Sequence, residues 1–359
     1  MAQAGVGTAG EIEVGGGGTS TSRNLLNWLF LIALVYLLIC AVSIIGDGFK
    51  MATGERAKQL FEFSANPFVG LMVGILATAL IQSSSTVTSV IVAFVAGGLP
   101  VATAVPMIMG SNIGTTLTNT LVSLGYVRDK EEFKRAFSAA TVHDFFNLIA
   151  VVIFLTLEIL FHPLERMATA TAGFFLGGAD MSIKSFNFVK AATAPVVDSV
   201  GGIAGNLPAV IAGILMIVIG IGLIFLAIRY IGVLLKELMV GRAKAIMHNA
   251  IGRGPVAGIA SGAIVTVLVQ SSSTTTSLMV PLAGSGTFSL RQIYPFTLGS
   301  NIGTTVTALL AATAVSGAAS GAALEIALVH LYFNVLAVAL IFGLPFLRNL
   351  PIFGAEWLA

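Results

Sequence analysis

The chain carries the same polar motif twice, each time inside a long apolar segment, and this duplication limits the possible fold more than any other feature. The sequence Gln-Ser-Ser-Ser-Thr stands within residues 70–89 and returns within 258–277, 188 residues later. The block Gly-Ser-Asn-Ile-Gly-Thr-Thr at 110–116 returns at 299–305, with an offset of 189. A histidine followed four residues later by an asparagine recurs with an offset of 187 (His143 and Asn147, His330 and Asn334). Three blocks at nearly equal offsets predict a fold made of two related halves.

Charged residues are too rare for this chain to cover a water-facing surface. They make up 9% of the 359 residues, against about 25% in a soluble domain. The apolar run Leu25–Ile45 has 21 residues, enough to span about 30 Å of hydrocarbon as a helix. The composition therefore predicts an all-α polytopic membrane protein in contact with the lipid bilayer. A formal net charge of +2 gives no sign of nucleic-acid binding.

Polar clusters interrupt the apolar segments inside each half. Residues 63–127 contain no charged side chain, yet polar residues gather at 82–89 and 110–120. The apolar pieces beside the first cluster are too short to span a bilayer, and backbone broken at membrane depth must be surrounded by protein or by water. We therefore predict, in each repeat, a re-entrant helical hairpin and a discontinuous transmembrane helix: 70–97 and 100–125, the latter broken around Ser111–Gly114, and again 255–283 and 287–313.

The number of membrane crossings predicts how the two repeats are related. Full-length helices are expected at 138–161, 206–232 and 325–347. A hairpin makes no net crossing, so three crossings separate the two hairpins, and an odd number makes the repeats inverted. The predicted divisions are a disordered N-terminal tail (1–22), the first transmembrane helix with repeat one (23–165), an extracellular loop (166–205), a connecting transmembrane helix with a cytoplasmic loop (206–247), repeat two (248–350) and a C-terminal tail (351–359).

The basic residues predict the orientation of the chain. In this topology 12 of the 18 Lys and Arg residues fall on the side that holds both termini. Cytoplasmic loops carry an excess of Lys and Arg. Both termini are therefore expected on the cytoplasmic side of the cell membrane.

The two Gln-Ser-Ser-Ser motifs have the chemistry to bind an anion and a cation together. A broken helix exposes backbone N–H groups at its positive dipole end, and serine hydroxyls and a glutamine amide add further donors for an anion. The same break exposes carbonyl oxygens which, with Ser and Thr hydroxyls, suit a hard cation such as Na⁺. Residues 292–324 also lack charged side chains. The solutes are therefore expected to balance each other's charge, as in co-transport.

The same residues also allow other interpretations. A single polar cluster in a membrane helix often only hydrogen-bonds to a neighbouring helix or to its own carbonyls, but two matched motifs favour a binding site. The glycines at 110, 114, 299 and 303 can serve close packing or a helix break. His143 and His330 can form buried hydrogen-bonded pairs with Asn147 and Asn334 or relay protons, and Asp144 is replaced by Leu331 in repeat two. Neither an enzyme nor a metal site beyond sodium is expected, because no serine has a basic partner and the histidines lack metal-ligand spacing.

The doubled motif, the two glycine-containing blocks and the run Phe133–Asn147 resemble the type II sodium-dependent phosphate cotransporters. The resemblance covers roughly residues 60–350. It implies two hairpins that meet at a central site and sodium-driven import of inorganic phosphate by alternating access, without a cofactor. It implies a phosphate site at the serines of both tips (Ser83, Ser84, Ser85, Ser272 and Ser273). The implied sodium ligands are Gln270, Ser271, Thr274, Thr304 and Thr307, with Gln82, Asn112 and Asn301 as further candidates and Asp129 for an additional sodium ion.

Two alternatives to phosphate symport stay open on the sequence. One is a sodium-coupled carrier of another oxyanion or of a carboxylate. The other is a non-transporting membrane partner of phosphate signalling. The sequence also leaves open the sodium-to-phosphate stoichiometry, the affinity and the oligomeric state.

Overall fold

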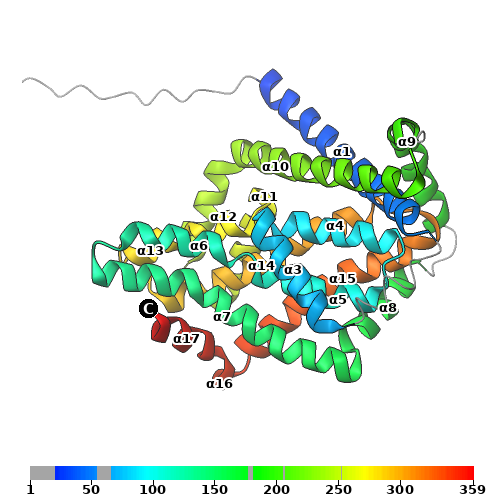
Figure 1. Cartoon of the computed structure of the whole chain (residues 1–359). Coiled ribbons are helices and arrows are strands. Elements are labelled where there is room, and N and C mark those ends of the chain that lie inside the picture. The colour runs from blue at the N-terminus through cyan, green and yellow to red at the C-terminus, as the bar shows by residue number, and fades with distance from the viewer. Residues whose placement is uncertain (1–20, 55–65, 177–180, 205–206, 252) are drawn as a thin grey trace, which may run out of the picture.

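The computed structural model describes residues 21–54, 66–176, 181–204, 207–251 and 253–359, and every regular element within them is a helix. The predicted all-α class is therefore confirmed for these residues. The expected N-terminal tail lies outside the described residues, apart from its last two, which begin the first helix. Figure 1 shows long helices packed side by side around several short ones.

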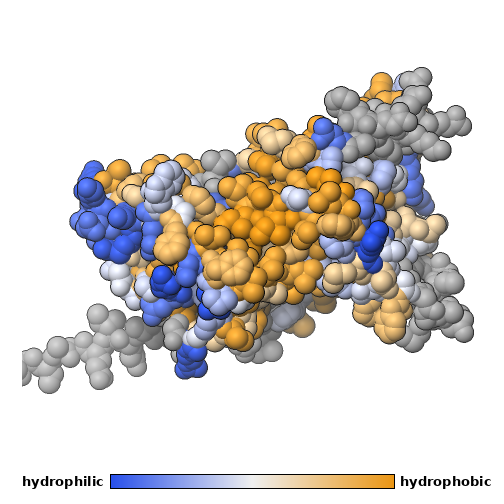
Figure 2. Space-filling view, turned by 90° about the horizontal axis from the view of Figure 1, so that it is seen from below, coloured by the Kyte–Doolittle hydropathy of each residue, from blue (hydrophilic) through white to orange (hydrophobic). Residues whose placement is uncertain are grey.

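Within the described residues, four segments are long and apolar enough to cross a membrane. They lie in α1 (Thr21–Thr53), α7 (Lys130–Phe161), α10 (Ala209–Ala250), and α15 (Ser320–Ala337) with the π-helical turn Val338–Phe342 that continues it. Figure 2 shows a broad hydrophobic band between hydrophilic ends on one face of the molecule. The length and composition of these helices indicate a multi-pass membrane protein.

Each half also contains helices that are too short to span. In the first half α3 (Pro67–Ile81) is followed by α4 (Ser84–Ala96), and in the second half α11 (Pro255–Val269) is followed by α12 (Ser272–Ser277) and α13 (Met279–Gly284). All of these are apolar except α12, which consists of Ser and Thr. A helix of 15 residues is only about 22 Å long, less than the hydrocarbon thickness of about 30 Å. The break between each pair of short helices falls at the Gln-Ser motif, as predicted.

Reciprocal glycines let two helix pairs approach each other closely. The helix α5 (Val101–Ile113) crosses α3, and α14 (Leu290–Ala312) crosses α11. A Cβ atom at Gly74 would clash with the Met107 carbonyl oxygen, and one at Gly110 would clash with the Leu71 carbonyl oxygen. The equivalent glycines of the second half face backbone carbonyls in the same way (Gly262 on Phe296 and Gly299 on Ile259). These glycines therefore serve close packing, one of the two roles expected for glycines 110 and 299.

The prediction of a discontinuous helix in both halves is correct only for the first half. There α5 ends at Ile113 and α6 (Thr116–Ser123) begins after a two-residue turn. In the second half α14 runs unbroken through 299–305, because its glycines keep a helical backbone while packing on α11. The additional break in this half lies at Leu278, between α12 and α13. Pro281 has no amide hydrogen to donate to the carbonyl of Ser277, so the helix is weakened there.

Three segments that were expected to be loops or tails are helical. The expected extracellular loop 166–205 contains most of α8 (Pro163–Leu176) and α9 (Met181–Ala204), and the expected cytoplasmic loop is the continuation of α10 to Ala250. The expected tail 351–359 lies in α17 (Leu350–Leu358), which packs on α7 with Ile352 and Ala355 buried. The expected span 325–347 ends at 342, before the short helix α16 (Pro345–Arg348).

Candidate functional site

The first Gln-Ser motif forms a tight turn between α3 and α4. Gln82 ends α3 with φ 59° and ψ 27°, a left-handed conformation that is uncommon for a residue with a side chain. Ser83 follows in an extended conformation and caps α4, because its Oγ accepts the backbone N–H of Thr86 at 3.2 Å. The Thr86 hydroxyl donates to the same Oγ at 2.9 Å. The motif therefore ends one helix and begins the next within two residues.

The second motif repeats this geometry between α11 and α12. Gln270 has φ 55° and ψ 26°, and Ser271 accepts the backbone N–H of Thr274 at 3.2 Å. The Ser271 hydroxyl also donates to the Thr274 hydroxyl at 3.0 Å. The two tips are thus alike in backbone conformation and in capping, as expected from the duplication.

A threonine from the neighbouring helix holds each glutamine side chain. Thr307 on α14 donates its hydroxyl to Gln270 Oε1 at 3.0 Å, and Thr118 on α6 donates to Gln82 Oε1 at 2.8 Å. Each glutamine amide nitrogen donates back to its own helix, to the carbonyls of Val267 and Ala79. A hydroxyl that donates in this way keeps lone pairs with which it can coordinate a cation.

Both tips line one cavity of about 410 Å³. Its polar wall consists of Gln and Ser from each break with one Thr from each following helix (Gln82, Ser83, Thr86, Gln270, Ser271 and Thr274). The helix α10 also lines the cavity, with apolar side chains, Gly232 and the exposed Arg229. The structure therefore brings residues from two distant parts of the chain to one place.

Four of the predicted phosphate-binding serines lie behind this wall. Ser84, Ser85, Ser272 and Ser273 are buried in the first turns of α4 and α12, and only Ser83 of the predicted phosphate set lines the cavity. Thr304 is buried on α14, one turn before Thr307, and donates its hydroxyl to the Ser300 carbonyl at 3.0 Å. Asp129 begins α7 as its N-cap and accepts the backbone N–H of Glu132 at 2.9 Å.

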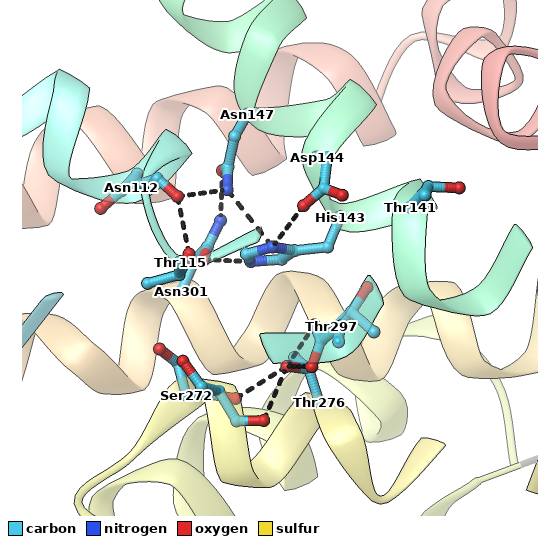
Figure 3. Close-up of polar contacts among 12 residues, drawn as sticks. Asn112, Thr115, Thr141, His143, Asp144, Asn147, Ser272, Thr276, Thr297 and Asn301 are labelled. Carbon is cyan, nitrogen blue, oxygen red and sulfur yellow. Dashed lines mark hydrogen bonds and ion pairs between the residues drawn. The ribbon is translucent and has the colours of Figure 1, made fainter. Parts of the chain in front are cut away.

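A closed ring of hydrogen bonds joins α7 to the second glycine block (Figure 3). His143 Nε2 lies 2.5 Å from Asn301 Oδ1, Asn301 Nδ2 donates to Asn147 Oδ1 at 2.7 Å, and Asn147 Nδ2 lies 3.3 Å from His143 Nδ1. A proton on His143 Nε2 satisfies all three contacts at once. The carboxylate of Asp144 lies beside this ring, with Oδ1 3.8 Å from His143 Nδ1. The histidine of the first half thus binds the asparagine of the second half.

The opposite pairing forms a second, related cluster. Asn112 Nδ2 donates to Asn334 Oδ1 at 2.7 Å, and Asn112 Oδ1 lies 3.4 Å from His330 Nε2. Asn147 Nδ2 also contacts the Asn112 carbonyl at 3.0 Å, which links the two clusters. Hydrogen bonds between the halves therefore supplement the contacts within each repeat, which join Asn147 Nδ2 to His143 Nδ1 in the first and Asn334 Nδ2 to the His330 backbone carbonyl, at 2.9 Å, in the second. The sodium role predicted for Asn112 and Asn301 stays a prediction.

Four polar or charged residues of the site escaped the sequence analysis: Thr86 and Arg229 of the cavity wall, and Thr118 and Asn119 on α6. Thr118 is found by subtracting the block offset of 189 from Thr307. Asn119 on α6 binds α12, since its Nδ2 donates to Thr276 Oγ1 at 2.8 Å and its Oδ1 accepts the Ser277 hydroxyl at 2.9 Å. Its counterpart is Ala308, so the duplication gives no signal for it.

The fold and the site define a multi-pass membrane protein in which two related halves present polar helix breaks to one cavity. The model of the Na⁺/Pi-cotransporter family matches residues 37–183 and 223–348, and the chain belongs to this family. The predicted family is thereby confirmed.

Individual relatives carry the same description. The chain is 32% identical to sodium-dependent phosphate transport protein 2B of Homo sapiens over 422 residues, which cover 92% of this chain and 60% of that protein. It is 32% identical to sodium-dependent phosphate transport protein 2A of Rattus norvegicus over 397 residues, which cover 91% and 62%. The chain therefore spans about 60% of the length of these curated relatives. No solved structure matches it.

Proposed function

We propose that this chain is a secondary active symporter that imports inorganic phosphate with sodium ions. The observation that carries the proposal is the shared cavity, whose polar wall is built from both Gln-Ser motifs. Family membership supports it, because the relatives named above are described as sodium-dependent phosphate transport proteins.

The sodium site is proposed at the second tip. Gln270 Oε1 and the Thr307 hydroxyl are already in contact, and Ser271 and Thr274 stand on the same cavity wall. Neutral oxygen atoms of this kind suit a hard monovalent cation. Thr304 lies one turn away on α14 and completes the proposed ligand set. At the first tip Gln82 and Thr118 form the equivalent contact and are proposed as a second cation position.

The phosphate site is proposed between the two tips. Ser83 and Ser271 offer hydroxyl groups to the cavity from its two halves. The N-terminus of α4, with Ser84 and Ser85 in its first turn, adds the positive end of a helix dipole. The same first-turn position in the second half is held by Ser272 and Ser273. An anion at this point would lie beside the proposed sodium ion, which would offset its charge.

The transport mechanism proposed for this site is alternating access between two inverted repeats. The short helices α3–α4 and α11–α12–α13 are proposed as re-entrant hairpins, because none is long enough to span. The glycine-packed crossings make α3–α5 and α11–α14 stiff pairs. Movement of one pair relative to the other would open the cavity to each side in turn. Both termini are proposed to lie on the cytoplasmic side, and the distribution of basic residues supports this orientation.

Uptake of radioactive phosphate by proteoliposomes tests the proposal. An inward sodium gradient should drive accumulation, and an equal potassium gradient should not. Equal uptake under both gradients would overturn sodium coupling. Unlabelled sulfate, arsenate and a dicarboxylate are added as competitors. If one of them lowers the uptake of radioactive phosphate more than unlabelled phosphate does, the chain is a carrier of that other anion. A complete absence of flux would favour a non-transporting role.

A further inference from the structure

One charged side chain faces the cavity from outside the repeated motifs. Among the described residues that line the cavity, Arg229 of α10 is the only one with a charge, and the rest are apolar side chains, glycine or neutral Gln, Ser and Thr. Arg229 is also the only charged residue in the membrane-spanning stretch Ala209–Leu235. A neutral cavity thus carries a single fixed positive charge.

Arg229 lies well inside the membrane-spanning part of α10, so anchoring the helix at the membrane surface does not by itself explain its charge. It lies six residues before the end of the stretch Ala209–Leu235, which is about 9 Å along the helix. A charge within a membrane-spanning stretch is costly unless it faces a polar cavity or a partner. Arg229 has no ion-pair or hydrogen-bond partner among the residues that the structure describes, and its side chain is exposed on the cavity wall. A diffusible anion is therefore the missing partner that this charge fits.

We propose that Arg229 binds the phosphate ion directly from the α10 side of the cavity. This inference rests on the proposed function, and it adds a ligand that lies outside both repeats. The planar guanidinium can donate two parallel hydrogen bonds to phosphate oxygens. Ser83 and Ser271 line the cavity from the tips and Arg229 lines it from α10, so all three can contact one anion there. When sodium leaves, Arg229 still offsets part of the phosphate charge, so the anion is not left in a neutral cavity.

Kinetics and equilibrium binding of three variants test this assignment. Arg229→Gln should raise the apparent KM for phosphate and weaken equilibrium binding of radioactive phosphate to the purified protein by roughly 10- to 150-fold, the range for loss of a charged hydrogen bond. Arg229→Lys keeps the charge without the planar fork and should fall between the wild type and Arg229→Gln. The matched control is Arg291→Gln, because Arg291 is an exposed arginine that donates to Asn349 at 3.0 Å and does not line the cavity.

The possible outcomes separate ligand, anchor and failed function. One outcome is that Arg229→Gln lowers the amount of protein in the membrane and leaves the phosphate KM and phosphate binding unchanged. That result would overturn the proposal and leave Arg229 as an anchor of α10 at the membrane surface. If Arg229→Gln does not fold, phosphate binding to Arg229→Lys equal to that of the wild type would overturn it. Failure of the wild type to show sodium-dependent uptake would refute the proposed symport. Equilibrium phosphate binding by the wild type and the variants would still decide the role of Arg229.

Discussion

Replacing Asn301 with alanine removes the residue that closes the first hydrogen-bonded ring. His143 Nε2 and Asn147 Oδ1, at 2.5 Å and 2.7 Å from the Asn301 amide, both lose a partner in this variant. The side chains are buried, so water does not replace it. Each buried group left without a partner costs about 1–3 kcal/mol in a soluble protein. Hydrogen bonds between membrane helices average about 0.6 kcal/mol and reach about 1.7. Two such bonds predict a loss of about 1–3 kcal/mol in the free energy of unfolding.

A double-mutant cycle isolates the ring from other effects of the substitution. Unfolding in detergent micelles is measured for His143→Ala, Asn301→Ala and the double variant. Because the shared bond can be lost only once, the double variant should be more stable than the sum of the single losses predicts, by about 0.5 kcal/mol or more. Asn349→Ala serves as the control, since that asparagine is in contact with Arg291 and not with the ring. Additive losses for His143 and Asn301 would refute the reasoning.

Sodium separates the ring role of Asn301 from the sodium-ligand role predicted from the sequence. A bound ligand stabilises the folded state, by about 2.7 kcal/mol at 100 times its dissociation constant. Asn301 does not line the cavity of the two tips, and its amide hydrogen-bonds to His143 and Asn147 instead. We therefore expect Asn301→Ala to keep the full increase in stability that sodium gives the wild type. Loss of that increase would assign Asn301 to the sodium site.

Four further substitutions test other parts of the site. Gln270→Ala should raise the sodium concentration needed for half-maximal uptake, because it removes the oxygen that contacts Thr307; unchanged sodium activation would reject this ligand. Ser83→Ala should raise the phosphate KM more than Ser84→Ala, because only Ser83 lines the cavity; the reverse order would place phosphate deeper in α4. Gly299→Ala should destabilise the protein by about 1–3 kcal/mol through overpacking and so lower its thermal unfolding temperature in detergent, because the added Cβ would clash with the Ile259 carbonyl oxygen. Wild-type stability of this variant would show that α11 and α14 can move apart. Asp129→Asn keeps the helix cap and should abolish any dependence of uptake on an imposed potassium–valinomycin potential if Asp129 holds an extra sodium ion; unchanged dependence would leave Asp129 as a cap only.

The sequence predicted the tips well because their signal is local and doubled. A Gln-Ser pair that interrupts an apolar run twice, at the same offset, marks the turn in each half, and both turns lie where they were expected. Gln270 and Thr307, both in the ligand set that the resemblance implied, are in contact, and their role in binding sodium stays a prediction. Helix ends at the surface were harder to predict. The apolar residues of α17 are consistent both with a tail beside lipid and with a helix packed on α7, and only the contacts of Ile352 and Ala355 decide between them.

Glycines and long-range pairs were the parts that the sequence could not settle. The same block, Gly-Ser-Asn-Ile-Gly-Thr-Thr, contains the break between α5 and α6 in the first half and forms unbroken helix within α14 in the second half. Identical sequence thus has two backbone outcomes, and the surroundings determine which one occurs. In the same way the spacing of His143 and Asn147 predicts a pair within one helix turn, whereas Asn301, 154 residues beyond Asn147, closes the ring. Nothing in the local spacing indicates that partner.

Each half of the chain binds the other through its asparagine, and this arrangement bears on how the chain arose and on whether its halves can be expressed separately. The asparagine of the first half binds the His–Asn pair of the second, and the asparagine of the second half binds the pair of the first. This reciprocity is the property of an isologous interface, in which residue i contacts j and j contacts i. A polypeptide with only one repeat could therefore make both clusters at once by pairing with a second copy of itself. The two halves, expressed as separate polypeptides, should accordingly recognise each other through these four asparagines and two histidines.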